Sequence, residues 1–142
     1  MSHAPVDWSR LRLPAPIPAL VVTPGHKQIF MFSAATWNRH HIHYSKDAAL
    51  AEGLPDVVVQ RALIGNFFAR LLSDWLGDAS VVRELSWKVS ASAVPGKALR
   101  VEGEALAWRL DGGQRDLECE LRITDDADRA IAAGRARLRL LA

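Results

Sequence analysis

The sequence has few of the features that mark secreted or membrane proteins. Its 142 residues include one cysteine, Cys119, so no disulfide can form within the chain and nothing points to an oxidising compartment. No apolar run approaches the ~18–20 residues that a membrane-spanning helix needs. Residues 1–6 lack the charged start and the apolar stretch of a secretory signal. We therefore expect a soluble, cytoplasmic protein.

An excess of charge of one sign is also missing. The net charge is +2 at pH 7, and the chain has no lysine-rich tract. The five tryptophans and four phenylalanines are scattered, without the paired aromatic motifs of an RNA-binding sheet. The composition therefore gives no reason to expect a nucleic-acid partner.

Length and composition favour one folded domain. The chain is 49% hydrophobic and 24% charged, a balance that argues against disorder, and its length suits one domain rather than two. A chain of this size buries roughly 70% of its unfolded surface, which provides one core but little room to enclose a large ligand. We expect a single domain over residues 26–142, with a second chain completing any large binding site.

Residues 1–25 contain five of the seven prolines and are expected to form an extended arm. Proline fixes φ and removes a backbone donor, which argues against a helix here. Apolar residues within the arm, including Leu13, Ile17 and Val21, indicate that it packs onto the rest of the protein.

Three segments have helical character. Residues 28–37 place Ile29 and Phe32 at helical spacing, and Ser45 is suited to cap a short helix over residues 46–52. The clearest helix is predicted over residues 56–76, where apolar residues repeat every four positions and few charges interrupt them. A helix this apolar is expected to be buried, and Gly77 is expected to end it.

The remainder of the chain has the pattern of about four long strands. Residues 117–124 alternate between apolar and polar side chains, and the end of the chain alternates in the same way. The tripeptide Asp111-Gly112-Gly113 is a strong hairpin signal between two of these strands. The sequence therefore predicts an α+β fold, an antiparallel sheet wrapped around one long buried helix.

Three of the five histidines lie within four positions, in the stretch Asn38-Arg39-His40-His41-Ile42-His43-Tyr44. This stretch, with the residues that lead into the buried helix, resembles the hydratase motif of the MaoC-like hot-dog family. The resemblance runs from about Phe32 to Gly96, and the strand pattern continues it to the end. The motif is most similar to a branch that includes mesaconyl-CoA hydratases and mitochondrial hydroxyacyl-thioester dehydratases, in which Asn commonly replaces the catalytic Asp.

The resemblance implies a dimeric enoyl-thioester hydratase or 3-hydroxyacyl-thioester dehydratase, acting on a CoA- or carrier-linked acyl group without metal or redox cofactor. It makes His43 the acid/base, because the ordinary pKa of imidazole, about 6.5, suits proton transfer near neutral pH. Asn38 would orient the water, and His40 is a candidate helper. The enolate oxygen would lie at the start of the buried helix, near three residues: Gln60, Arg61 and Ala62.

Three departures from the usual family pattern leave other functions open. Asn38 removes the carboxylate of the usual Asp, Arg61 stands where the family usually has Gly, and Gln60 replaces a His. Arg61 would then either crowd the thioester or bind a charged acyl group or a CoA phosphate. The first alternative is a non-catalytic or acyl-thioester-binding hot-dog subunit of a hetero-oligomeric dehydratase. The second is a thioesterase, for which Asp56 and Asp74 are the acidic candidates on the predicted helix.

The remaining reactive side chains have simpler interpretations. His41 is expected to face solvent, and Cys119 lies on the apolar side of a strand. A metal site built on His40 and His43 lacks further ligands at suitable spacing. The alternating arginines near the end of the chain are expected to cover a solvated sheet face, or else to meet CoA phosphates or an acidic carrier; they are Arg135, Arg137 and Arg139.

Overall fold

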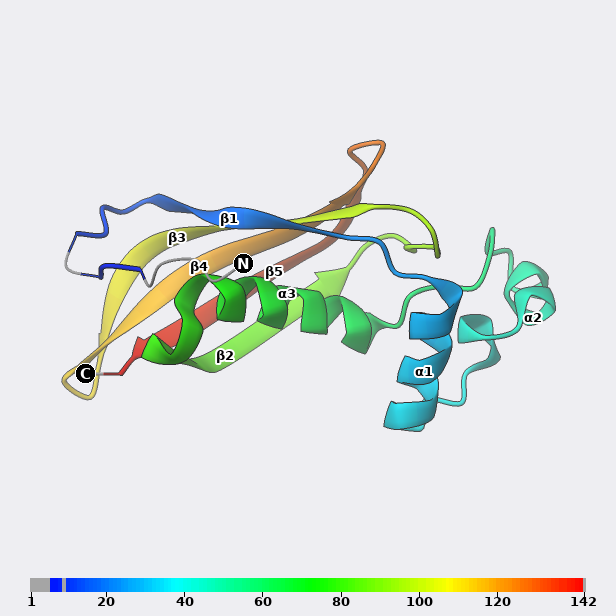
Figure 1. Cartoon of the computed structure of the whole chain (residues 1–142), viewed down its shortest axis with the longest axis horizontal. Coiled ribbons are helices and arrows are strands. Elements are labelled where there is room, and N and C mark those ends of the chain that lie inside the picture. Colours follow the sequence, from blue (N-terminus) through cyan, green and yellow to red (C-terminus); the bar gives the residue numbers. More distant parts are fainter. Residues whose placement is uncertain (1–5, 9, 142) are drawn as a thin grey trace.

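A five-stranded antiparallel sheet curves along one long helix in the computed structural model, which describes residues 6–8 and 10–141 (Figure 1). The strands follow the order β1-β3-β4-β5-β2 across the sheet. Their bounds are β1 Ala15–Val22, β2 Ser80–Val89, β3 Leu99–Asp111, β4 Gln114–Asp125 and β5 Ala130–Leu140. The α+β fold predicted from the sequence, a sheet around a single buried helix, is confirmed.

The helices fall into two groups (Figure 1). The long helix α3 lies on the sheet, whereas α1, α2 and the short 3₁₀ helix η1 lie together beyond one end of it. The bounds are α1 His26–Thr36, η1 His41–His43, α2 Lys46–Ala51, α3 Arg61–Leu76 and the 3₁₀ helix η2 Gly77–Ala79. The Ser45 side chain accepts the Ala48 N–H, which confirms the predicted cap of α2. Within the described residues, none of the helices has the length and apolar content that a membrane crossing requires.

The core lies between α3 and the inner face of the sheet. Phe67, Phe68 and Leu71 of α3 are buried against inward-facing strand residues such as Leu117 and Leu138. Each such side chain contributes roughly 1.5–3 kcal/mol when it leaves water. This packing holds α3 in one position against the sheet, so the residues at the start of the helix also have a defined position relative to the sheet.

The buried helix begins later than the sequence predicted. The apolar repeat suggested a start at residue 56, but α3 begins at Arg61. The preceding valines are β-branched and favour extended backbone. The Val58 N–H donates to the Ile42 carbonyl at 3.0 Å and the Val59 N–H to the Ala93 carbonyl at 2.9 Å. Residues 57–59 therefore form an extended segment, hydrogen-bonded to Ile42 of η1 and to Ala93 of the loop after β2, rather than the first turn of a helix.

Part of the predicted N-terminal arm is an edge strand of the sheet. Residues 15–22 form β1 and pair antiparallel with β3, with a register shift between Ile17 and Leu20. An edge strand has one unpaired side, so it tolerates Pro16 and Pro18, which lack a backbone N–H. These residues are therefore part of the sheet itself and add a fifth strand to the four predicted. Residues 1–5 and 9 of the arm lie outside the described part of the chain.

Candidate active site

His43 is the buried member of the histidine cluster. It ends η1, its residue is 9% exposed, and its Nδ1 lies 2.7 Å from the Val58 carbonyl oxygen. A carbonyl can only accept a hydrogen bond, so the neutral ring carries its proton on Nδ1. Nε2 is therefore left with a free lone pair, the form that a general base requires.

Asn38 lies directly after α1, where the chain turns toward η1. Trp37 ends the helix in the left-handed region with φ 57°, and the Asn38 N–H donates to the Ser33 carbonyl at 3.0 Å. The Asn38 Oδ1 accepts the His40 N–H at 3.2 Å. This hydrogen bond uses one of the two lone pairs of the amide oxygen, so the second remains available to a water molecule.

The other two histidines of the cluster are exposed and differ in their neighbours. The His40 ring lies 5.9 Å from the His43 ring, centroid to centroid, with 58° between the planes. The His41 ring instead packs on Tyr44 at 5.5 Å in an edge-to-face arrangement. The structure thus brings His40 next to His43, whereas His41 is exposed, as the sequence predicted, and packs on Tyr44.

Gln60 fastens the start of α3 to α1. Its side chain is 1% exposed, and Nε2 donates to the Ile29 carbonyl at 2.7 Å and to Ser33 Oγ at 2.8 Å. Both acceptors belong to α1, while the Gln60 Oε1 is buried and has no hydrogen-bond partner among residues 6–8 and 10–141. Gln60 therefore joins the helix that precedes Asn38 to the helix start where an enolate oxygen was expected.

Arg61 is held against the edge strand β2. Its Nη2 donates to the Trp87 carbonyl at 3.0 Å, and the Trp87 Nε1 donates back to the Arg61 carbonyl at 2.9 Å. The guanidinium also lies 5.3 Å from the centroid of the indole ring, a cation–π contact. The next residue, Ala62, is exposed. Because the first intrahelical bond runs from the Ile64 N–H to the Gln60 carbonyl, the N–H groups of the first turn are not used within the helix.

Sequence reasoning missed the residues that orient His43. The hydrogen-bond acceptor is the backbone carbonyl of Val58, and a backbone group leaves no signature in residue type. The only available signal was the run of three valines before the helix, which favours an extended segment with unpaired carbonyls.

The described residues contain neither a reactive cysteine nor a cluster of metal ligands. Burial raises the pKa of the Cys119 thiol to about 12, so it stays protonated and inert at neutral pH. Within residues 6–8 and 10–141, no group of three His, Cys, Asp or Glu side chains is arranged to hold a metal ion.

Two of the three arginines that were expected on the sheet face, Arg137 and Arg139, form ion pairs with the buried carboxylate of Asp116. Arg139 donates to Asp116 through Nε at 2.7 Å and Nη2 at 3.0 Å, and Arg137 lies 3.6 Å from the same carboxylate. The hydrogen bond from Arg139 holds the pKa of Asp116 below its usual range. Only Arg135 is exposed and faces the groove described next.

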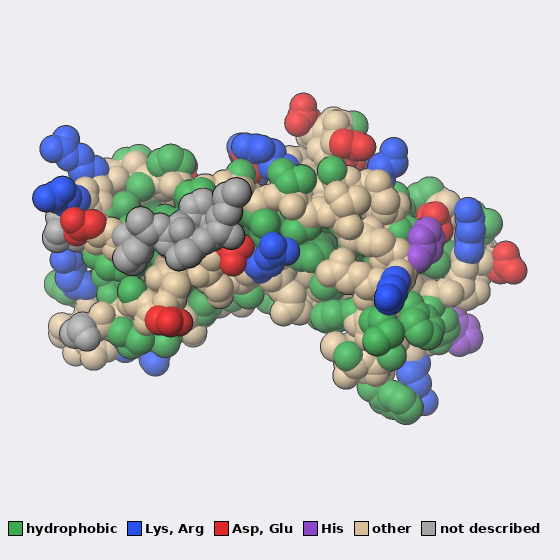
Figure 2. Space-filling view, viewed as in Figure 1, with side chains coloured by type: hydrophobic (Ala, Val, Ile, Leu, Met, Phe, Trp, Pro, Cys, Tyr) green, Lys and Arg blue, Asp and Glu red, His purple; other side chains and the backbone are tan. Residues whose placement is uncertain are grey.

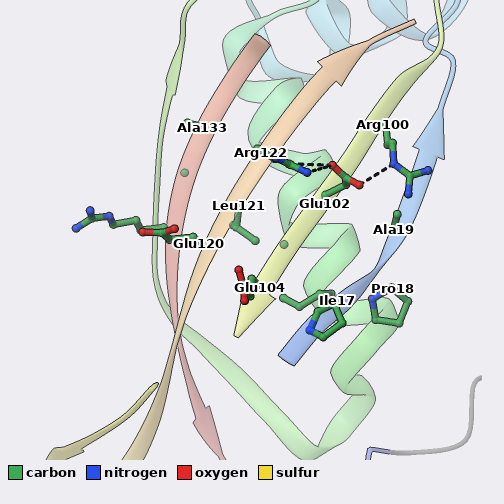
Figure 3. Close-up of a pocket in the computed structure, with 14 residues that line it drawn as sticks. Ile17, Pro18, Ala19, Arg100, Glu102, Glu104, Glu120, Leu121, Arg122 and Ala133 are labelled. Atoms are coloured by element: carbon green, nitrogen blue, oxygen red, sulfur yellow. Dashed lines mark hydrogen bonds and ion pairs between the residues drawn. The ribbon is translucent and has the colours of Figure 1, made fainter. Parts of the chain in front are cut away.

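A groove lies on the outer face of the sheet, away from the described histidines. It has a volume of about 900 Å³ and is lined by residues of β1, β3, β4 and β5 (Figure 3). Glu102 lies in it between Arg100, at 2.7 Å, and Arg122, at 2.9 Å. None of the histidines in the described part of the chain lines this groove, so its ion pairs are separate from the His43 site.

Similar folds occur in hydratases and dehydratases. The (R)-hydratase from A. caviae involved in PHA biosynthesis matches with a TM-score of 0.84 and 20% identity, over 93% of this chain and 98% of that chain. The MaoC-like dehydratase from Rhodospirillum rubrum matches with a TM-score of 0.82 and 13% identity, over 96% and 97%. The ChsH1-ChsH2 complex from Mycobacterium tuberculosis contains a chain that matches with a TM-score of 0.80 and 18% identity, over 90% and 97%.

At these identities the structural matches establish the hot-dog fold alone. No curated protein matches the sequence closely enough to be counted as a relative. The sequence of residues 10–95, however, matches the family described as hydroxyacyl-thioester dehydratase type 2, and this stretch contains the histidine cluster, the valine segment and α3. Because the match spans well over half of the 142 residues, the chain belongs to the hydroxyacyl-thioester dehydratase type 2 family.

Proposed function

We propose that the protein is an enoyl-thioester hydratase, or 3-hydroxyacyl-thioester dehydratase in the reverse direction, acting on a CoA- or carrier-linked acyl group. The observation that carries this proposal is the buried His43, whose Nδ1 bonds to the Val58 carbonyl and whose Nε2 forms no hydrogen bond with the described residues. Membership of the hydroxyacyl-thioester dehydratase type 2 family supports it.

In the proposed hydration, His43 moves one proton in two steps. Nε2 takes a proton from water as the water oxygen bonds to Cβ, and the electrons of the C=C bond move toward the thioester to form an enolate. The imidazolium then returns a proton to Cα, so that one water is added and the ring is neutral again. Dehydration follows the same steps in reverse.

Asn38 and the start of α3 have supporting roles in this proposal. The second lone pair of Asn38 Oδ1 orients the water, and His40, whose ring centroid lies 5.9 Å from that of His43, is the helper in proton transfer. The enolate oxygen is placed at the first turn of α3, where the N–H groups of Arg61 and Ala62 and the helix dipole stabilise negative charge.

The proposal is tested by incubating the purified protein with crotonyl-CoA. Hydration is measured as the loss of enoyl-thioester absorbance. The substitution His43→Ala is expected to lower kcat by roughly 10²–10⁴-fold, the usual contribution of general acid–base catalysis. His41→Ala is the matched control, because His41 is in the same 3₁₀ helix but packs on Tyr44. An unchanged rate in the His43 variant would remove this residue from the mechanism.

We also propose that a second hot-dog chain completes the site. Hydrophobic side chains gather on the surface over α1, beside the histidines (Figure 2). Phe30 and Met31 are each 55% exposed and Trp37 is 76% exposed, an amount of exposed apolar surface that is typical of an interface. The second chain is another copy in a homodimer, or a different chain as in the ChsH1-ChsH2 complex.

A non-catalytic subunit of such a hetero-oligomer is the second candidate function. Measuring the mass of the purified protein in solution together with its hydratase activity separates the two. An active homodimer excludes the subunit role, whereas a chain that gains activity only with a second hot-dog protein excludes the first proposal.

A thioesterase has less support from the arrangement of the acidic residues. Asp56 precedes α3 and its Oδ1 accepts the Val57 N–H, and Asp74 pairs with Arg70 near the far end of the helix. Release of free CoA from acyl-CoA would indicate this activity. The cytoplasmic location stays a prediction from the sequence.

A further inference from the structure

The segment that orients His43 has each of its three N–H groups bonded to a separate acceptor. These pairs are Val57 to Asp56 Oδ1 at 2.7 Å, Val58 to the Ile42 carbonyl at 3.0 Å and Val59 to the Ala93 carbonyl at 2.9 Å. Two acceptors are backbone carbonyls that any sequence would supply, whereas the first is the side chain of Asp56.

We propose that Asp56 is a positioning residue for His43, an inference that rests on the proposed hydratase function. The bond from the Val57 N–H to Asp56 keeps the chain extended as it enters residues 57–59. The Val58 carbonyl then faces η1, where it accepts the Nδ1 proton of His43. Without this bond the Val58 carbonyl turns away from His43, and the ring proton distributes between Nδ1 and Nε2. A smaller fraction of the protein then has the Nε2 lone pair that accepts the proton from water.

The contribution of Asp56 is its acceptor oxygen rather than its charge. The same Oδ1 lies 3.7 Å from Nε2 of His26, whose side chain is 70% exposed. An ion pair this long and this exposed stabilises little, because water screens it. Asn in place of Asp56 keeps an acceptor at the same position, whereas Ala removes it, and this difference separates the two contributions.

The test measures both turnover and the position of the ring proton. We expect Asp56→Ala to lower kcat for crotonyl-CoA by about 10- to 100-fold with KM changed less than about threefold, since a misplaced reacting group costs up to about 10²-fold. Nitrogen NMR of the whole chain should show the Nδ1-protonated ring of His43 in the wild type and a mixture of tautomers in this variant. Asp56→Asn should restore both readouts, and His26→Ala should change neither.

Three results would overturn the proposal: an Asp56→Ala variant that keeps the wild-type tautomer, an Asp56→Asn variant as impaired as Asp56→Ala, or a His26→Ala variant with the same defect. Should Asp56→Ala prove unfolded by circular dichroism, Asp56→Glu replaces it, because it keeps the charge but displaces the oxygen; an unchanged tautomer in that variant also refutes the inference. A wild-type protein without hydratase activity refutes the proposed function instead, and the NMR measurement, which needs no substrate, still decides the role of Asp56.

Discussion

Gly65 of α3 is the position where a single methyl group should disturb the start of the helix. The Trp87 indole lies directly over this glycine, so an alanine Cβ would overlap the ring, with Cε2 only 2.6 Å away. The ring cannot shift freely, because its Nε1 donates to the Arg61 carbonyl and its face carries the Arg61 guanidinium. The substitution Gly65→Ala therefore forces either strain in the helix or loss of the Trp87–Arg61 contacts.

The expected change in the free energy of unfolding follows from two unfavourable contributions and one favourable contribution. Overpacking costs typically 1–3 kcal/mol, and displacing the ring removes a hydrogen bond that contributes about 1 kcal/mol. Alanine in a helix interior gains about 1 kcal/mol over glycine, which offsets the second loss. We expect Gly65→Ala to lower the free energy of unfolding by about 2 kcal/mol, measured by urea denaturation.

A double-mutant cycle isolates the overlap from the helix propensity. In a Trp87→Ala background the ring is absent, so Gly65→Ala should raise the free energy of unfolding by about 1 kcal/mol. If Gly65→Ala stabilises the wild-type chain by that same amount, the indole does not constrain this position and the reasoning is refuted.

Two further predictions concern charged residues outside the histidine cluster. Arg61→Met should lower the free energy of unfolding by about 1–2 kcal/mol, because it removes the guanidinium contacts with Trp87. The same variant should leave KM for crotonyl-CoA within about threefold of the wild-type value. A KM raised more than about tenfold would show that Arg61 binds the substrate instead. Asp116→Asn should destabilise the protein at pH 7. The pKa of Asp116 is lower in the folded protein than the ordinary value of about 3.9, so its contribution is complete above that value and is lost as pH falls through the folded pKa. Urea denaturation at pH 7 and pH 3 should therefore show a difference between the two proteins that shrinks in acid, and a constant difference would contradict this account.

The parts of the fold that depend on periodicity were predictable from the sequence. The four-residue repeat from Leu63 to Trp75 identified α3, and the alternation over residues 117–124 identified β4, because each period places one face in the core. The glycines after Asp111 identified the β3–β4 hairpin, where Gly112 and Gly113 adopt positive φ of 57° and 80°.

Features that depend on partners distant in the sequence were not predictable. The apolar repeat continues back through Val59, so the pattern alone places it in the helix; only the acceptors at Ile42 and Ala93 make the segment extended. The prolines of residues 1–25 predicted an extended arm rather than a helix, whereas the place of β1 at the sheet edge depends on pairing with β3, which no local pattern reveals. The sequence motif identified His43 as the candidate residue, but the tautomer of its ring is set by the Val58 carbonyl, which the motif does not reveal.

The three positions where the chain differs from the usual family pattern share a structural property. Asn38, Gln60 and Arg61 each form side-chain hydrogen bonds within the chain: to the His40 N–H, to α1 and to the Trp87 carbonyl, respectively. In each case the side chain is held by a neighbouring element, so none of them is free to replace His43 as the group that exchanges protons. An amide and a guanidinium also cannot act as bases at neutral pH. If the proposed hydration occurs, proton transfer must therefore run through His43, assisted at most by His40.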